Sequence, residues 1–409
     1  MALLSRRFLA RGPRHRIVIL GGNFAGLSAA RAFSSSTAHI TLIDRSPDAE
    51  WLPNVHELLS RRKTAEQLKS GRQALLQAWG HNFLQTEVAT LECAQQRLVT
   101  TTGERLDYDL LLLASGSRAH DHGIPGVAEH ALHPRSVTQG LRISNALTRL
   151  AALPAGRDVV IVGGGLEGLE MLGEILQRFG REGRLNLHLV EQETKLFPRF
   201  PGLHERLLEQ MRGEVQIHSG HRIAAVHADS VQLDDGRLLP SRLTIWSAGR
   251  RGQELASRAG LATNGDDVAV HSSLQSRSDA HVFVAGDAAA LPRALDKQAH
   301  YAQAMGAHAA ANMQRLLQGQ PLQDFRPLHK PSLLAFGDRD GVMFFEQQAL
   351  ASPALIALKE GLYQYGMRSW QPQGRGLLRM ASRLQRGMSE LDLWGLLLKS
   401  RDSQLFTQR

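Results

Sequence analysis

Short apolar runs that end in glycine recur along the chain and predict the buried strands of parallel sheets. Residues 17–20 and 39–43 are such runs, and a helix of small residues is expected between them. The same order of strand, glycines, helix and strand returns from residue 159 to residue 190. A strand–helix–strand order of this kind is typical of nucleotide-binding units. The chain is therefore expected to hold two of them, with their glycines 142 residues apart.

Three further apolar strands, each ending in a glycine turn, mark where each fold continues: 108–113, 243–246 and 282–285. We interpret the first fold as interrupted by the second. The expected class is α/β, with two Rossmann-like dinucleotide-binding domains and a mainly helical C-terminal unit. The expected domains are 1–120 with 270–325, the inserted 150–265, and the C-terminal 326–409.

The second glycine run, Gly163-Gly164-Gly165-Leu166-Glu167-Gly168, satisfies the G-x-G-x-x-G pattern. Its first glycine makes the tight turn, its second lets a pyrophosphate approach, and its third lets helix and strand pack closely. Amides at the start of the following helix then face the phosphates. The strand before it, the helix after it and the acid Glu191 complete a dinucleotide site.

The first run, Gly21-Gly22-Asn23-Phe24-Ala25-Gly26, departs from the pattern because Asn23 replaces the middle glycine. Asparagine tolerates unusual backbone angles, although its side chain takes room near the phosphates. Asp44 lies 23 residues past Gly21, where an acid can bind a ribose diol. This run is therefore also predicted to be a dinucleotide site.

Glu191 bears on the choice between the nicotinamide cofactors. A carboxylate at this position accepts a hydrogen bond from a ribose 2′-hydroxyl but repels a 2′-phosphate. No arginine occurs in the four residues after it, although Lys195 is a candidate phosphate partner. The sequence favours NADH over NADPH.

The order of the glycine motifs resembles that of the two-dinucleotide-binding-domain flavoproteins, over residues 16–315. The resemblance implies FAD in the first site and NAD(P)H in the second. It also implies that Asp287 bonds the FAD ribityl chain and that the backbone of Val88 contacts adenine. The further cofactor-binding residues that it implies are Arg45, Pro53, Ala114, Ser115, Gly116, Ala248, Gly249, Gly286 and Ala299.

Residues 299–306 lie where type II NADH dehydrogenases, which the chain also resembles, carry Ala-Gln-x-Ala-x-Gln-Gln-Gly. His300 and Ala304 replace the two key glutamines, and a histidine can still donate a hydrogen bond to a carbonyl. Asp296 is expected to cap a helix that starts near Lys297 beside the flavin ring. Lys297 and His300 are the candidate catalytic residues.

Two short patches, 331–341 and 399–402, resemble the apoptosis-inducing-factor-like quinone reductases. The resemblances together imply an FAD-dependent NADH:quinone oxidoreductase of the non-proton-pumping type. One alternative is a soluble NADH reductase of a small carrier such as a ferredoxin or rubredoxin. Another is a redox-sensing binding protein.

Cys93 is the single cysteine, which excludes an internal disulfide and a Cys-x-x-Cys redox pair. Disulfide reduction and paired-cysteine sulfide oxidation are therefore not expected, and neither is a metal site.

The net charge of +9 is concentrated at the two ends. Residues 1–16 carry five arginines and no acid, and residues 355–409 carry nine basic against four acidic side chains. Residues 374–388 place an apolar stripe opposite four arginines, and a second helix is expected within 389–398. We expect a cytoplasmic protein held peripherally at the inner face of an anionic membrane. No nucleic-acid partner is expected, because aromatic residues do not interleave with basic ones, and homodimerisation is left open.

Overall fold

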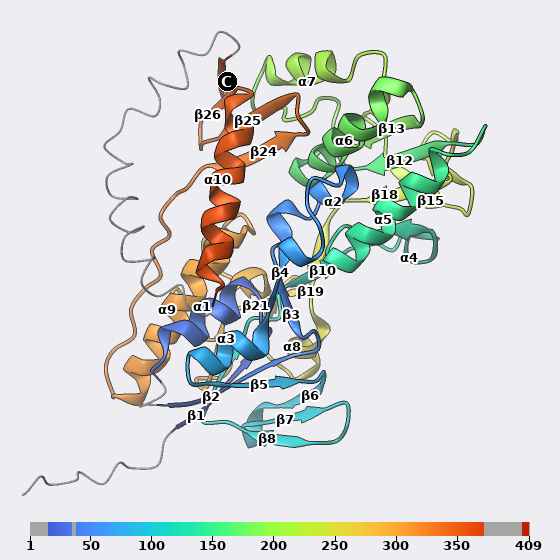
Figure 1. The fold of residues 1–409 in the computed structure, drawn as a ribbon. Coiled ribbons are helices and arrows are strands. Elements are labelled where there is room, and N and C mark those ends of the chain that lie inside the picture. Colours follow the sequence, from blue (N-terminus) through green and yellow to red (C-terminus); the bar gives the residue numbers. More distant parts are fainter. Residues whose placement is uncertain (1–14, 35–37, 372–402, 409) are drawn as a thin grey trace, which may run out of the picture. The chain divides into compact units, whose positions relative to one another are not determined.

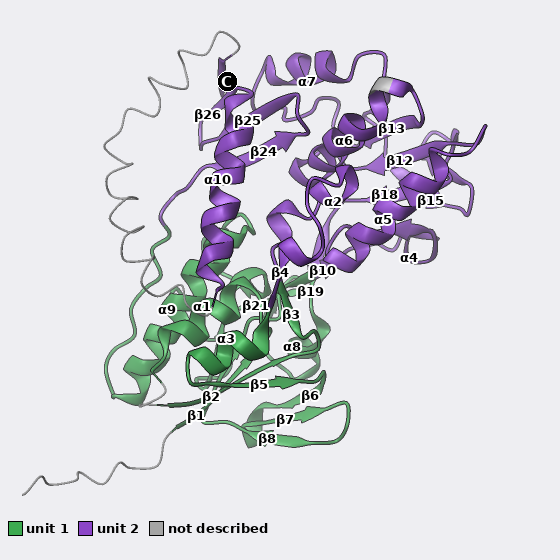
Figure 2. Cartoon of the chain, in the orientation of Figure 1, with its two compact units in different colours: residues 1–49, 71–117, 252–327 green, residues 50–70, 118–251, 328–409 purple. Residues whose placement is uncertain are grey.

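The computed structural model describes residues 15–34, 38–371 and 403–408 (Figure 1). The chain divides into two compact units, which Figure 2 colours separately. Unit 1 holds residues 1–49, 71–117 and 252–327, and unit 2 holds residues 50–70, 118–251 and 328–409. Each unit contains a five-stranded parallel sheet, so the predicted α/β class is confirmed.

The sheet of unit 1 has the strand order β22-β9-β1-β2-β5, and all its paired neighbours are parallel. The central strand β1 is buried from Ile17 onward, because the sheet covers its edges and helices cover its faces. The apolar runs in the sequence predicted four of the five strands. The strands are β1 (His15–Leu20), β2 (Ala38–Asp44), β5 (Asn82–Gln85), β9 (Leu110–Leu113) and β22 (Val282–Val284).

Small residues let the two main helices of unit 1, α1 (Phe24–Ala32) and α9 (Ala299–Leu317), pack lengthwise against each other. A Cβ atom at Gly306 would lie 2.0 Å from the carbonyl oxygen of Ala25, so only glycine permits this approach. The remaining elements of unit 1 are α3 (Arg72–Ala78), β6 (Val88–Glu92), β7 (Arg97–Thr100), β8 (Arg105–Asp107), α8 (Glu254–Arg258), β20 (Thr263–Asn264), β21 (Asp267–Ala269) and β23 (Ala289–Ala290).

The sheet of unit 2 has the order β11-β18-β12-β13-β14, again with parallel pairing throughout. Val160 and Ile161 at its centre are fully buried. The predicted strands at 159–162, 187–190 and 243–246 all belong to it. Its strands are β11 (Ala131–Leu132), β12 (Asp158–Val162), β13 (Asn186–Glu191), β14 (Val215–Ser219) and β18 (Leu243–Trp246).

Helices α5 (Val137–Leu150) and α6 (Leu166–Phe179) are the long helices among residues 118–251 of unit 2. A three-stranded antiparallel sheet follows β14. The other elements in this part are α4 (Val127–His130), α7 (Leu203–Met211), β15 (Ile223–Val226), β16 (Ser230–Leu233) and β17 (Leu238–Pro240), and residues 50–70 of unit 2 hold α2 (Glu57–Ser60). Short strands mark the places where the chain passes between the units: β3 (Asp48–Glu50), β4 (Lys69–Gly71), β10 (Ser117–Ala119) and β19 (Arg250–Gly252).

The described C-terminal residues form an antiparallel sheet with one helix, in contrast to the mainly helical unit expected there. The sheet consists of β24 (Ser332–Phe336), β25 (Asp340–Phe344), β26 (Gln348–Ala351) and β27 (Gln404–Thr407), and α10 (Ala354–Ser369) packs on it. A left-handed glycine at Gly337 makes the turn between β24 and β25. The helices expected within 374–398 lie outside the described residues.

The observed units differ from the expected domains in three segments. Residues 50–70, which were expected in the first domain, group with unit 2. Residues 252–269 group with unit 1, because β21 pairs with β23 next to the exit of β22. Residues 328–409 group with unit 2, because β24 packs on α6. A Cβ atom at Gly173 would lie 2.4 Å from the backbone nitrogen of Gly337, which shows how close this contact is. Among the described residues, no helix is long and apolar enough to cross a membrane.

Candidate functional site

The first glycine loop, in unit 1, joins β1 to α1 with a turn that only glycine allows. Gly21 has a φ of 103°, and a Cβ atom there would lie 2.3 Å from the carbonyl oxygen of Ala114. A Cβ atom at Gly26 would lie 1.8 Å from the oxygen of Gly21, so the third glycine lets α1 start directly above the loop. The Asn23 side chain makes no capping hydrogen bond to α1, and the first turn carries no acid. The start of α1 can therefore receive a phosphate.

Asp44, at the end of β2, is held against the first loop by backbone amides. Its Oδ2 accepts a hydrogen bond from the amide of Gly22 at 2.7 Å, and its Oδ1 accepts from the amide of Ser46 at 2.9 Å. These contacts orient the carboxylate beside the loop, where sequence reasoning expected an acid for a ribose diol.

Arg72, the first residue of α3, also binds Asp44, and sequence reasoning did not identify it. Its guanidinium lies 3.3 Å from Asp44 Oδ2 and donates to the carbonyl oxygens of Gly22 and Ser46. The side chain is only 4% exposed. One signal was available in the sequence, because a cation in the first turn of a helix opposes the helix dipole and needs a compensating partner.

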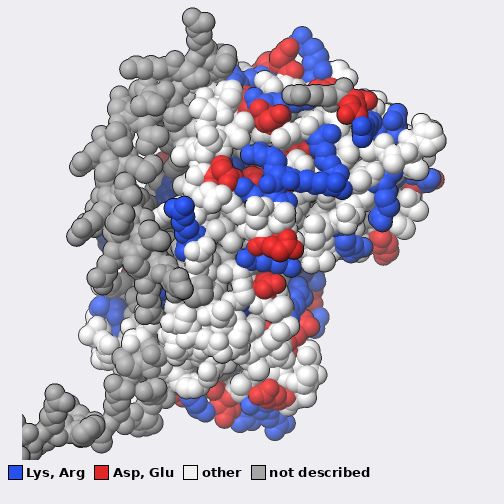
Figure 3. All heavy atoms as spheres, viewed as in Figure 1, with Lys and Arg blue, Asp and Glu red and all other residues white. Residues whose placement is uncertain are grey.

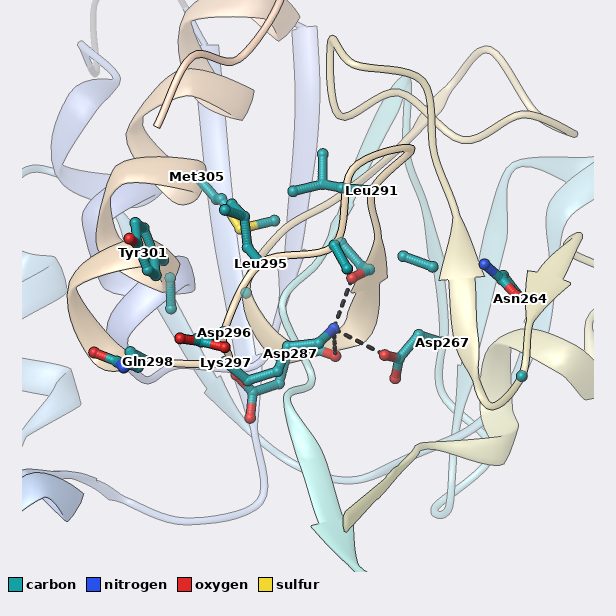
Figure 4. Close-up of a pocket in the computed structure, with 16 residues that line it drawn as sticks. Asn264, Asp267, Asp287, Leu291, Leu295, Asp296, Lys297, Gln298, Tyr301 and Met305 are labelled. Carbon is teal, nitrogen blue, oxygen red and sulfur yellow. Dashed lines mark hydrogen bonds and ion pairs between the residues drawn. The ribbon is translucent and has the colours of Figure 1, made fainter. Parts of the chain in front are cut away.

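Asp287 lies at the wall of a cavity of about 240 Å³ in unit 1 (Figure 4). It follows Gly286, which has a φ of 73°, and its Oδ2 accepts a hydrogen bond from Ser117 Oγ at 2.8 Å. The cavity is also lined by Lys297 and by Tyr301 of α9. An acid at a cavity wall, with a serine hydroxyl bound to it, suits a polyhydroxyl chain such as ribityl.

Lys297 is bound to the wall of this cavity. Its ammonium donates to the carbonyl oxygens of Asp287 at 2.8 Å and Ala289 at 2.7 Å, and it pairs with Asp267 at 2.8 Å (Figure 4). The predicted catalytic lysine thus holds together the segment that carries Asp287. A catalytic role for Lys297 stays a prediction, and sequence reasoning did not foresee these partners.

Helix α9 begins at Ala299, so the prediction that Asp296 caps a helix near Lys297 is wrong. The N-cap residue is Gln298, whose backbone is extended and whose side chain makes no capping hydrogen bond. His300 lies in the first turn, with its ring centroid 4.1 Å from that of Tyr301. The start of α9 still borders the cavity through Gln298 and Tyr301.

The second glycine loop, in unit 2, repeats the geometry of the first. Gly163 has a φ of 102°, and a Cβ atom at Gly168 would lie 1.9 Å from its carbonyl oxygen. A Cβ atom at Gly165 would meet no atom within 4 Å, so the loop is open where a pyrophosphate is expected to approach. Glu191 Oε2 accepts from the amide of Gly164 at 2.6 Å, as Asp44 does in unit 1.

Three carboxylates lie along α6, which follows this loop: Glu167, Glu170 and Glu174. Burial raises the pKa of Glu167 to about 7, and the Arg135 guanidinium 3.8 Å away opposes the shift. Burial likewise raises the pKa of Glu170, which binds Lys359. Glu174 is fully buried, and burial raises its pKa to about 7 although Ser60 and Arg62 bind it. The helix after the second loop can therefore hold protons near neutral pH, a property that sequence reasoning did not predict.

The remaining predicted residues lie at turns and element ends. In unit 1, Gly116 has a φ of 67°, Val88 begins β6, and the exposed Arg45 lies 3.8 Å from Glu87. In unit 2, Gly249 has a φ of 78°, and the oxygen of Ala248 accepts from Trp246 Nε1 at 2.7 Å. Pro53 belongs to unit 2, whereas the other residues predicted to bind FAD belong to unit 1. Phe24, Ala25, Ala114, Ser115, Leu166 and Ala299 begin or directly adjoin α1, β9, α6 and α9.

Comparisons with known proteins agree with this arrangement. A family model described as pyridine nucleotide-disulphide oxidoreductase matches residues 15–311. A type II NADH:quinone oxidoreductase of Staphylococcus epidermidis is 25% identical over 386 residues, which cover 85% of this chain and 94% of that protein.

Solved structures share the fold. The structure of NDH2 from Plasmodium falciparum in complex with NADH has a TM-score of 0.75 and 15% identity, and the match covers 81% of this chain and 90% of that one. The sulfide:quinone oxidoreductase of Aquifex aeolicus has a TM-score of 0.77 and 19% identity, with coverage of 96% and 97%. At these identities the structures support the fold alone.

Proposed function

Because the chain belongs to the pyridine nucleotide-disulphide oxidoreductase family, we propose that it is an FAD-dependent NADH:quinone oxidoreductase. The observation that carries the proposal is the presence of two glycine loops, each with its own bound carboxylate, in one chain. The curated relatives named as type II NADH:quinone oxidoreductases support it over most of their length. The family name refers to disulfides, but Cys93 is the only cysteine, so the chain has no intrachain redox pair.

The residues of unit 1 fit FAD. Asp44 offers its carboxylate to the adenosine ribose, the start of α1 receives the pyrophosphate, and Asp287 with Ser117 receives the ribityl chain. Bound flavin supplies the two-electron chemistry, accepting hydride and passing electrons on. Lys297 keeps Asp287 in place, and His300 in the first turn of α9 is the candidate donor to a quinone carbonyl.

The residues of unit 2 fit NADH. Gly165 leaves the pyrophosphate position open, and Glu191 accepts from the ribose 2′-hydroxyl while repelling a 2′-phosphate. The chain therefore needs little acid–base chemistry of its own. Its task is to bind and orient the two dinucleotides.

Purified protein should be yellow, with one non-covalent FAD per chain, and should oxidise NADH in the presence of a quinone. Steady-state rates should be measured against a panel of ubiquinone and menaquinone analogues, ferredoxin and rubredoxin. Quinone reduction far above carrier reduction is the expected result. Reduction of the small carriers alone would replace this proposal with the soluble-reductase alternative.

We also propose that the enzyme works at the cytoplasmic face of an anionic membrane. Both ends of the chain are basic, and in unit 2 Lys and Arg side chains gather over α2 and α5 (Figure 3). Arg61 next to α2 and Arg178 of α6 both donate to the hydroxyl of Thr148 in α5. Each cation near an anionic lipid surface contributes about 1 kcal/mol to binding.

The membrane proposal is tested by charge removal rather than by truncation. Deleting residues 374–409 would remove β27, which pairs with β26, so a truncated chain would also lose part of a sheet. A variant with Arg375, Arg379, Arg383 and Arg386 changed to Gln keeps that strand. Vesicles containing phosphatidylserine should bind wild type in a salt-sensitive way and this variant much less. Equal binding of both proteins would mean that these arginines are not the membrane contact.

A further inference from the structure

The two glycine loops hold their carboxylates in the same way. Asp44 Oδ2 and Glu191 Oε2 accept from the amides of Gly22 and Gly164, at 2.7 Å and 2.6 Å. The second oxygen of each carboxylate accepts from the amide two residues farther along the chain, at 2.9 Å in both units. Any difference in how the two sites treat a nucleotide must therefore come from the surroundings of this shared arrangement.

The side chain that packs on the second residue of each loop is different. A Cβ atom at Gly22 would lie 2.5 Å from Arg72 Nε, and a Cβ atom at Gly164 would lie 2.4 Å from Leu196 Cδ2. Arg72 is 4% exposed and Leu196 is 1% exposed. An arginine in unit 1 and a leucine in unit 2 thus fill the same place beside the loop.

This difference changes the charge at each carboxylate. The Arg72 guanidinium lies 3.3 Å from Asp44, and its bonds to Gly22 and Ser46 fix it in place. Among the described residues, no cation lies within ion-pair distance of Glu191, whose carboxylate accepts hydrogen bonds from the backbone amides of Gly164 and Glu193. The Asp44 carboxylate is therefore held by a cation as well as by amides before any ligand arrives, whereas the Glu191 carboxylate is held by backbone amides without a paired cation.

We infer that Arg72 is a positioning residue that makes unit 1 a retention site for FAD, and that Leu196 leaves unit 2 exchangeable and selective against a 2′-phosphate. Pre-organisation lowers the cost of ordering the site on binding, so the nucleotide in unit 1 dissociates slowly. A full negative charge at Glu191 repels a second phosphate. The inference rests on the proposed function only in assigning FAD to unit 1 and NADH to unit 2.

The test uses reciprocal variants of the holoenzyme. Arg72→Leu places the apolar side chain of unit 2 in unit 1, and Leu196→Arg does the reverse. Arg72→Lys and Leu196→Met are the matched controls, which keep the charge and the apolar character. Circular dichroism and thermal melting should first show that each variant is folded.

The first readout is the rate at which FAD leaves the diluted holoenzyme, followed by the fluorescence of freed flavin. Arg72→Leu should release FAD at least about tenfold faster, because a charge-assisted hydrogen-bond network is lost. Arg72→Lys should fall between it and wild type, and Leu196→Arg should match wild type. Unchanged release from folded Arg72→Leu would overturn the inference, while a wild type that carries no FAD would instead overturn the proposed function.

The second readout is the ratio of NADP⁺ to NAD⁺ affinity, measured calorimetrically without turnover. Leu196→Arg should raise this ratio by about tenfold, because its guanidinium would pair with Glu191 and meet the 2′-phosphate. Leu196→Met and Arg72→Leu should leave the ratio unchanged. A ratio that stays the same in Leu196→Arg, or rises equally in Leu196→Met, would show that charge at this place does not set the selectivity.

Discussion

Unit 1 and unit 2 each contain a buried strand followed by a glycine turn, but the helices that follow these turns differ in what they carry. Helix α1 consists mainly of small apolar residues and packs closely on α9. Helix α6 carries the buried Glu170 and Glu174 and, in its first turn, Glu167, whose side chain is 38% exposed. One glycine loop is thus followed by a close-packed apolar helix and the other by a helix whose carboxyl groups have raised pKa values. A shared ligand-binding turn therefore does not imply a shared response to pH or to mutation.

The largest expected effect separates the two loops. Gly168→Ala would place a Cβ atom 1.9 Å from the oxygen of Gly163, so the loop must shift. The rate of flavin reduction by NADH should fall on the order of 100-fold, because a misplacement of about 1 Å has this cost in rate. Flavin content should stay at the wild-type level. The matched variant Gly26→Ala should instead lose flavin, and loss of both nucleotides in either variant would show that the two loops do not act independently.

A smaller effect is expected from Asp287→Ala, which removes the acceptor for Ser117 at the cavity wall. FAD affinity should fall about 10- to 100-fold, as expected for losing a charged hydrogen-bond partner. Equilibrium dialysis of the flavin gives the measurement. Asp296→Ala is the control, because Asp296 lines the same cavity but does not cap α9. Equal weakening by the two variants would mean that Asp287 has no specific role.

Glu191→Gln tests whether the carboxylate of unit 2 selects the cofactor. Removing its charge should raise the rate of reduction by NADPH relative to NADH, by about tenfold. Stopped-flow absorbance at the flavin band measures both rates. Asp44→Asn makes the equivalent change in unit 1 and should leave this ratio as it is in wild type. If Glu191→Gln still prefers NADH as strongly as wild type does, another residue sets the selectivity.

The smallest effect concerns the stability of unit 2 at different pH values. Burial raises the pKa of Glu174 to about 7 from its ordinary value of 4.5, so the folded chain holds a proton that the unfolded chain releases. The free energy of unfolding should therefore fall as the pH rises from about 4.5 to 7, by up to about 3 kcal/mol. Glu174→Gln should lose this part of the pH dependence in urea titrations. A pH profile identical to that of wild type would mean that Glu174 is ionised in the folded state.

The sequence predicted the parts of the fold that have a local pattern. Buried parallel strands are continuous apolar runs, and a glycine turn must follow the strand directly, so β1, β12 and both loops were found. Arg72 was missed because it lies 28 residues past Asp44 and meets it only through the fold. The contacts of Lys297 were missed for the same reason, since one of its partners, Asp267, comes from the β21 strand.

The domain division and the start of α9 were mispredicted because tertiary contacts decided them. Residues 252–269 follow the NADH-site strand in sequence, yet β21 pairs in unit 1. Asp296 is a residue type that often caps helices, but the N-cap residue is Gln298 and α9 begins at Ala299. Periodicity and composition report on local preference, and neither reports which distant strand supplies a partner.

Strand β27 gives the C-terminal region a second point of attachment. Gln371 follows α10 and Gln404 begins β27, which pairs with β26, so both lie in unit 2. A chain segment fixed at both ends can extend from its anchors by at most half its contour length. For the 31 residues from 372 to 402 that limit is about 50 Å, at roughly 3.3 Å per residue. A tail of the same length fixed at one end would reach twice as far. If these residues hold the enzyme to a lipid surface, the two attachment points keep unit 2 within this distance of that surface.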